Sequence, residues 1–153
     1  MAASDRLSIP LIKRCIRHTL RLEGVDIPCE VSVLITDDIG IREINREFRK
    51  IDRSTDVLSF PAQEILSPGR IIHQHGSIDS ETGLLPLGDI VFSAERVGIQ
   101  ASENAQTRER ETAYLTIHSV LHLLGYDHTD EAEGKRLMRE REREILEELR
   151  VKS

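Results

Sequence analysis

Apolar residues recur at helical spacing near the start of the chain and alternate with polar residues soon afterwards. The first pattern predicts a helix over 9–22, in which apolar side chains repeat every four residues at Ile12, Ile16 and Leu20. Pro10 is tolerated in the first turn of such a helix, and Gly24 is a typical residue just beyond its end. Residues 30–35 then alternate in polarity and are rich in β-branched side chains, which predicts a strand.

A second amphipathic helix is predicted after Asp37 and Asp38, which are favourable N-cap residues. Its apolar positions recur at helical spacing, at Ile41, Ile44, Phe48 and Ile51. If this helix continues through residue 53, its basic side chains form a parallel stripe of Arg42, Arg46, Arg49 and Arg53. We interpret the stripe as a solvated helix face, and the functional alternative is a contact with phosphate groups.

The rest of the chain predicts two further strands and a largely helical C-terminal half. The predicted segments are strands over 56–60 and 88–92, a loop or hairpin over 66–86, and helices from Ser93 to the C-terminus, interrupted near Gly98 and over 125–128. Together these segments predict the α+β class. We expect one domain over 1–153, in which a small mixed β-sheet is flanked by helices.

The last predicted helix, over about 130–150, carries alternating basic and acidic residues at 139–144. Like charges four residues apart repel each other and opposite charges three apart attract, so the run adds little to helix stability. We interpret it as a solvated outer face. The apolar positions of this helix are Leu137, Met138, Ile145, Leu146 and Leu149.

Composition and charge narrow the class of protein. Hydrophobic residues make up 39% of the chain, but aromatic residues only 3% and tryptophan is absent, so the core must be largely aliphatic. The formal net charge of −6 disfavours a nucleic-acid coat protein, although a local basic patch for one RNA strand is compatible with it. No apolar run spans a membrane and no secretory signal is visible, and we interpret Cys15 and Cys29 as reduced thiols of a cytosolic protein.

Three histidines and one glycine form the most specific chemical pattern in the chain. His118 and His122 lie one turn apart in a strongly apolar helical segment, so their rings share one face. Gly125 lets the chain reverse after this helix, and His128 can then return to the same ion. Three neutral imidazoles leave the fourth position of a tetrahedral zinc ion open, which is typical of a catalytic site. The pattern therefore predicts one Zn²⁺ ion bound by His118, His122 and His128.

The spacing resembles the HExxHxxGxxH motif of the metzincin proteases, whose zinc helix supplies the first two histidines. Ser119 stands where those proteases have their catalytic glutamate, so no adjacent side chain can act as a peptidase base. This difference argues against a peptidase. A metal-dependent hydrolase of another substrate remains as an alternative.

Four segments resemble the YbeY family of ribosomal RNA maturation endoribonucleases. The sequence HSVLHLLGYDH at 118–128 is similar to the family signature HGxLHLxGYDH, with Ser119 in place of the usual glycine. The sequence FRKIDRSTDVLSFP at 48–61 resembles the family stretch YRxxDxPTDVLSFP, with Ser54 in place of the usual proline. The other two segments are LGDIV at 87–91 and the C-terminal helix positions Met138, Glu142, Ile145 and Leu146.

The resemblance implies a metal-dependent endoribonuclease specific for single-stranded RNA, with roles in ribosomal RNA maturation and ribosome quality control. It implies that the zinc ligands are His118, His122 and His128, and that Arg49 is a functional residue of the cleft. The expected partners are single-stranded RNA, ribosomal RNA and the small ribosomal subunit, and the location that the resemblance implies is the cytoplasm. The alternative is a non-catalytic, zinc-stabilised, ribosome-associated module.

These residues account for the metal and for a phosphate contact in the expected cleavage reaction, but not for a general base. Zinc lowers the pKa of bound water from about 15.7 to about 7 and can polarise a phosphoryl oxygen. The guanidinium of Arg49 is the candidate partner for the negative charge that builds on phosphate during cleavage. Attack by water and attack by the ribose 2′-hydroxyl both stay open, and no residue is assigned as the general base. We interpret Asp127 as a hydrogen-bond partner of a ligand histidine.

His73 and His75 lie in the predicted loop with strand-like spacing. We interpret them as surface histidines, and the alternative is a second metal site.

Overall fold

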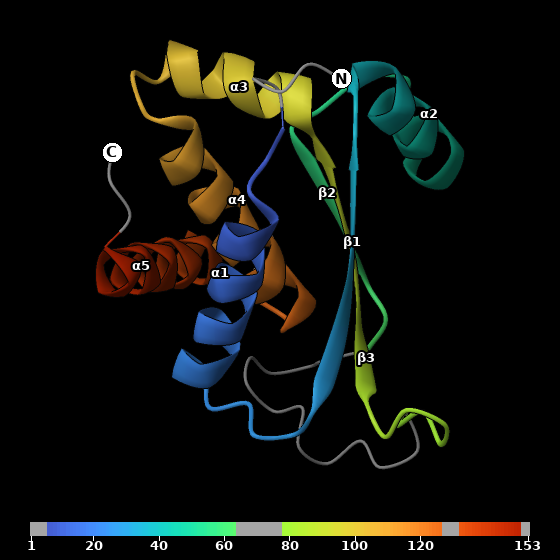
Figure 1. Cartoon of the computed structure of the whole chain (residues 1–153), viewed down its shortest axis with the longest axis vertical. Helices are drawn as coiled ribbons and strands as arrows, with labels where there is room; N and C mark the ends of the chain where they lie inside the picture. The colour runs from blue at the N-terminus through green and yellow to red at the C-terminus, as the bar shows by residue number, and fades with distance from the viewer. Residues whose placement is uncertain (1–5, 64–77, 127–131, 151–153) are drawn as a thin grey trace.

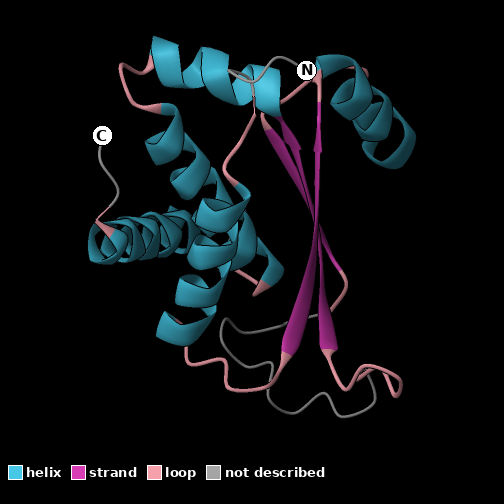
Figure 2. Cartoon of the chain, in the orientation of Figure 1, coloured by secondary structure: helices cyan, strands magenta, loops and turns pink. Residues whose placement is uncertain are grey.

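The computed structural model describes residues 6–63, 78–126 and 132–150. Helices and strands alternate in the first half of the chain, and the second half is helical (Figure 2). The elements are α1 (Ile9–Leu22), β1 (Cys29–Thr36), α2 (Asp38–Arg49), β2 (Val57–Pro61), β3 (Leu85–Ser93), α3 (Ala94–Glu103), α4 (Arg108–Leu123) and α5 (Ala132–Leu149). This arrangement confirms the predicted α+β class.

The three strands form a mixed sheet in the order β1-β3-β2. The central strand β3 pairs in parallel with β1 and in antiparallel with β2. Gly88 lies in β3 at a point of close approach, because a Cβ there would lie 2.2 Å from the carbonyl oxygen of Phe60 and 2.8 Å from Cδ2 of Leu123. Its φ of 145° also favours glycine. This position therefore lets β2 and α4 lie close to β3.

The two faces of the sheet are covered differently. Helices α1, α4 and α5 lie on one side of it, and α2 lies on the other side near one end (Figure 1). The larger core lies among the three helices and the sheet, and its largely aliphatic character agrees with the composition. A smaller core under α2 contains Ile41, Leu58 and Val91. The central helix is α4, which is buried along most of its length.

The predicted starts of the first two helices are confirmed, and a side chain caps each of them. The Oγ of Ser8 accepts a hydrogen bond from the Leu11 N–H, and Oδ1 of Asp37 accepts one from the Gly40 N–H. Asp38 belongs to the first turn of α2, where its carboxylate receives hydrogen bonds from the Ser93 hydroxyl and from Arg96. Each cap satisfies one of the backbone donors that a helix start leaves without a partner.

One predicted helix boundary was wrong, and the condition for the basic stripe on a second helix is not met. The chain does not break near Gly98, because α3 continues through it to Glu103 and the break lies over 104–107. A Cβ at Gly98 would lie 3.4 Å from Nη2 of Arg108, which is an ordinary van der Waals contact, and this glycine does not end the helix. The second helix does not reach Arg53, because α2 ends at Arg49 and Lys50 adopts the left-handed conformation with φ 61°. Arg53 therefore cannot extend the predicted basic stripe.

The interpretation of 139–144 as a solvated face was wrong for two of its residues. Glu142 is 4% exposed and lies in the buried stripe of α5, beside Met138 and Ile145. The side chain of Arg141 is 24% exposed because it turns toward α1. Leu137, predicted as an apolar contact position, is 45% exposed.

The predicted loop over 66–86 is described only in its last part. Residues 78–84 form a turn in which Oδ1 of Asp79 accepts a hydrogen bond from the Glu81 N–H, and β3 already begins at Leu85. His73 and His75 lie outside the described residues. Within the described ranges, no helix has the length and apolar character needed to cross a membrane.

Cys15 and Cys29 are both free thiols, as predicted. Burial raises the pKa of the Cys15 thiol to about 11, and burial also raises the pKa of Cys29. Both side chains therefore stay protonated near neutral pH and act as packing groups.

Candidate metal centre

The second half of α4 brings two histidine rings together. His118 and His122 lie one turn apart, their ring centroids are 4.6 Å apart, and their Nε2 atoms are separated by 3.1 Å. This confirms that the two side chains share one face of the helix. The flanking side chains of Ile117, Leu121 and Leu123 are fully buried, so packing fixes the rotation of α4 and thereby the direction of both histidines.

A buried carboxylate from α5 holds the first of these rings. Oε2 of Glu142 lies 2.5 Å from Nδ1 of His118. An ionised carboxylate can only accept, so Nδ1 is the donor. In the neutral ring, Nε2 then carries the lone pair and faces His122. Metal-binding histidines are oriented in the same way by a carboxylate on the second ring nitrogen.

Tyr114 completes the surroundings of Glu142. Its ring centroid lies 5.9 Å from that of His118, and its hydroxyl forms a hydrogen bond with Glu142. Burial, followed by the negative charge of Glu142, raises the pKa of Tyr114 to about 12. The phenol therefore stays protonated near neutral pH and donates to the carboxylate, and it is a poor candidate for a general base.

The chain reverses directly after the histidine helix, as Gly125 predicted. Leu124 caps α4 and Gly125 has a φ of 96°. The Gly125 N–H donates to the carbonyl of His122, and the Tyr126 N–H donates to that of Leu121. This pair of hydrogen bonds is a Schellman motif, which satisfies two carbonyls at the helix end. His128 and Asp127, the predicted third ligand and its neighbour, lie outside the described residues.

The donor atoms of His118 and His122 suit a zinc ion in type and in spacing. Two ligands of a tetrahedral zinc ion, each at about 2.0–2.1 Å, lie about 3.3 Å apart. The two Nε2 atoms are 3.1 Å apart. Among the described residues, no third His, Cys, Asp or Glu completes a metal-binding group with this pair. His118 and His122 thus supply two imidazole donors with the spacing that such an ion requires.

Arg49, the predicted cleft residue, lies at the C-terminal end of α2 and reaches the edge strand β2. Its Nη2 donates to the carbonyl of Ser59 at 2.6 Å, and its guanidinium lies 5.2 Å from the ring centroid of Phe60. Backbone hydrogen bonds to β3 are made by Asp56 and Ala62, so alternation along the strand points the Ser59 carbonyl away from β3. Strand β2 also packs against α4, the helix that carries both histidines.

An apolar cavity of about 370 Å³ lies on the α2 side of the sheet. Phe48 and Phe60 line it and pack edge to face, with ring centroids 5.9 Å apart. The histidines belong to α4, on the opposite side of the sheet (Figure 1). Arg49 therefore lies at the strand edge that separates the cavity from the histidine side.

Ser119 is enclosed by the core and is 1% exposed. Its Oγ has no hydrogen-bond partner among the described residues. A hydroxyl in this position has no access to solvent, which agrees with the expectation that Ser119 does not replace the metzincin glutamate.

This burial gives a prediction about stability. Replacing Ser119 with alanine removes an unsatisfied buried hydroxyl, so we expect the free energy of unfolding to rise by about 1 kcal/mol. Urea unfolding of the metal-free protein measures this change. The Ser119→Gly variant serves for comparison and should fall about 1 kcal/mol below the alanine variant, because glycine weakens a helix interior. A loss of stability in Ser119→Ala would show that the hydroxyl has a partner.

Sequence reasoning missed Glu142 as a site residue. A usable signal was present, because Glu142 has helical spacing with Met138, Ile145 and Leu149, the apolar positions of the same helix. A carboxylate in an apolar stripe must find a partner on the helix against which the stripe packs. The alternating charges of 139–144 concealed this position.

The chain is similar to known proteins over nearly its whole length. A family model described as Endoribonuclease YbeY matches residues 4–150. An Endoribonuclease YbeY of Clostridium kluyveri (strain NBRC 12016) is 44% identical over 153 residues, covering 97% of this chain and 92% of the relative. One of Clostridium botulinum (strain Loch Maree / Type A3) is 46% identical over 140 residues, covering 88% of this chain and 84% of the relative.

Among solved structures, the solution structure of TM1509 from Thermotoga maritima is similar, with a TM-score of 0.61 and 29% identity. The match covers 92% of this chain and 79% of that protein. With the family model spanning nearly the whole sequence, the chain belongs to the YbeY family of endoribonucleases.

Proposed function

We propose that the chain is a zinc-dependent endoribonuclease that cleaves single-stranded RNA in ribosomal RNA maturation and ribosome quality control. Membership of the YbeY family supports the reaction class. One observation of the structure carries the metal dependence. The Nε2 atoms of His118 and His122 converge to 3.1 Å while a buried carboxylate holds the other nitrogen of His118. Without a cation, this arrangement places two imidazole rings and a buried carboxylate together where α4 meets α5, at a cost in solvation.

The proposed zinc ligands are His118, His122 and His128. When bound, the ion supplies a Lewis acid for the phosphoryl group and an acidified water. Glu142 keeps the ring of His118 in the tautomer and orientation that ligation needs. With three histidine ligands, the ion would stay accessible to the scissile phosphate or to water.

Arg49 is the proposed contact for the RNA backbone. Its guanidinium has five N–H donors, and within the described ranges one hydrogen bond, to the Ser59 carbonyl, orients it along β2. The remaining donors can fork onto a phosphate, where negative charge increases during cleavage. The partners proposed for this surface are single-stranded RNA, ribosomal RNA and the small ribosomal subunit, in the cytoplasm.

Removal and return of the metal test this proposal. Protein treated with a chelator and dialysed should lose cleavage of a labelled single-stranded RNA, and one equivalent of zinc should restore it. The same strand annealed to its complement should resist cleavage. The His122→Ala variant, purified in parallel, controls for contaminating ribonucleases. Undiminished cleavage by the metal-free protein would contradict the proposal.

The ends of the products identify the attacking oxygen. Attack by the ribose 2′-hydroxyl leaves a 2′,3′-cyclic phosphate, whereas attack by water leaves no cyclic end. Mass spectrometry of the fragments distinguishes the two reactions.

A further inference from the structure

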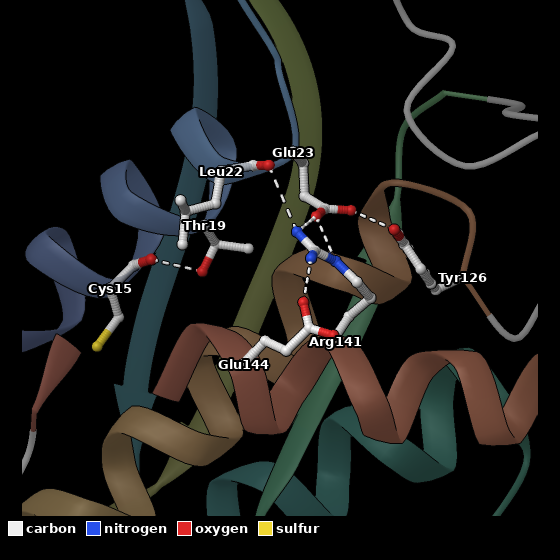
Figure 3. Close-up of polar contacts among 7 residues, drawn as sticks. All are labelled: Cys15, Thr19, Leu22, Glu23, Tyr126, Arg141 and Glu144. Atoms are coloured by element: carbon white, nitrogen blue, oxygen red, sulfur yellow. Dashed lines mark hydrogen bonds and ion pairs between the residues drawn. The ribbon is translucent and has the colours of Figure 1, made fainter. Parts of the chain in front are cut away.

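A buried carboxylate at the end of α1 joins three parts of the fold. Glu23 caps α1, and its side chain is 4% exposed. Its Oε1 accepts a hydrogen bond from the hydroxyl of Tyr126, in the turn after α4. Its Oε2 accepts hydrogen bonds from Nε and Nη2 of Arg141, in the middle of α5, at 2.8 Å for Nε (Figure 3). We refer to Glu23, Tyr126 and Arg141 as the anchor cluster.

Arg141 has further partners that determine its direction. Its Nη1 donates to Oε2 of Glu144 at 2.6 Å, and its Nη2 lies 3.4 Å from the carbonyl oxygen of Leu22 (Figure 3). Most donors of the guanidinium are thus in use, and its plane is fixed against the end of α1. Because a single rotamer satisfies all these contacts, the anchor cluster restrains the rotation of α5 about its own axis.

Stability alone is a weak reason for such a cluster. The desolvation of a buried ion pair cancels much of its attraction, and well-packed apolar residues often stabilise a protein as much or more. What an ion pair with several hydrogen bonds does provide is a defined geometry. The anchor cluster therefore matters chiefly for the position in which it holds α5.

The residue that follows Arg141 in α5 contacts a histidine of the candidate metal centre. This residue, Glu142, meets Nδ1 of His118 at 2.5 Å. Consecutive residues of a helix differ by about 100° in direction and about 1.5 Å along the axis. The anchor cluster and the Glu142–His118 contact thus hold the same turn of α5 from two directions. A shift of one residue would break both.

We infer that the anchor cluster is a positioning device, which sets the rotation and register of α5 so that Glu142 holds His118. Glu23, Tyr126 and Arg141 are positioning residues and need not touch substrate. Their effect on metal affinity rests on the proposed function, whereas their effect on the Glu142–His118 contact does not.

The contact itself can be measured without metal. Nitrogen-15 NMR of the imidazole rings reports which nitrogen of His118 carries the proton, and a strong hydrogen bond moves that proton downfield. In Arg141→Met, we expect the Nδ1–H signal of His118 to weaken and move upfield. Glu142→Gln, which changes the acceptor directly, shows how large the change can be. Arg143→Met, which removes an exposed charge from the same helix, should leave the signal unchanged.

A second measurement separates positioning from general stability. Competition with a chromophoric chelator gives the zinc affinity, which should fall about 10-fold in Arg141→Met. Losing a group that forms a hydrogen bond with a metal ligand has an effect of this size. Arg141→Lys, which keeps the charge and one hydrogen bond, should recover part of this loss. Leu149→Ala also destabilises α5 but lies outside the cluster, and it should leave the zinc affinity within about 2-fold of the wild type.

The outcomes are distinct. An unchanged His118 signal in Arg141→Met would overturn the inference, and so would an equal change in Leu149→Ala. If the wild-type protein binds no zinc, the proposed function fails, while the NMR comparison still decides the role of the anchor cluster.

Discussion

Replacing His122 with alanine is expected to abolish both zinc retention and RNA cleavage without unfolding the protein. Loss of an outer partner of a metal ligand costs about 10–100-fold in affinity, so loss of a ligand itself should exceed about 100-fold. The fold should persist because the neighbouring side chains of Leu121 and Leu123, not the partly exposed ring, fill the core. Elemental analysis of the purified variant and a single-stranded RNA assay measure the two losses.

His18→Ala is the matched control for this experiment. His18 lies on α1, where its Nδ1 is 2.7 Å from Nη2 of Arg21, and no role in the site is assigned to it. The control should keep the metal and the activity of the wild type. If His122→Ala retained one zinc ion and cleaved RNA normally, the proposed ligand set would be wrong.

Reversing the charge of Arg49 is expected to abolish cleavage while leaving zinc binding intact. In Arg49→Glu, a carboxylate stands where the proposal needs a cation, so it repels the phosphate backbone and opposes the charge that develops during cleavage. The variant also loses the hydrogen bond to Ser59 and the contact over Phe60, both at the protein surface. We therefore expect a loss of about 1 kcal/mol in the free energy of unfolding. Cleavage rate, zinc content and urea unfolding are measured on one preparation.

Two further variants show which property of Arg49 matters. Arg49→Lys keeps the charge but lacks the planar fork, so it should retain weakened cleavage. Arg17→Glu makes the same change in net charge on the exposed face of α1 and should cleave like the wild type. Normal cleavage by Arg49→Glu would remove Arg49 from the proposed mechanism.

Several features of the site followed from local sequence. The spacing of His118 and His122 places them on one helix face because an α-helix has about 3.6 residues per turn. Gly125 ends that helix because a left-handed residue after the last turn satisfies its free carbonyls. These outcomes depend on neighbours within about five residues, so the pattern of the chain was sufficient to predict them.

Other features depended on how the elements dock. Glu142 is 24 residues from His118, and Arg141 is 118 residues from Glu23, so neither contact has a local signature. The alternating charges of 139–144 are compatible with several orientations of α5, and packing selects the one that buries Glu142. Gly98 shows the reverse error, since a residue type that often ends a helix lies inside α3, which continues to Glu103.

The sequence by itself determined the three strands, the first two helices and the pair of histidines, because each arises from the conformations of adjacent residues. Only the tertiary structure decided the order β1-β3-β2, the carboxylate on His118 and the contact between Arg49 and β2. The physical reason is that the angle and register between two packed elements come from the fit of whole surfaces. That fit joins residues far apart in the chain, and no short segment contains it.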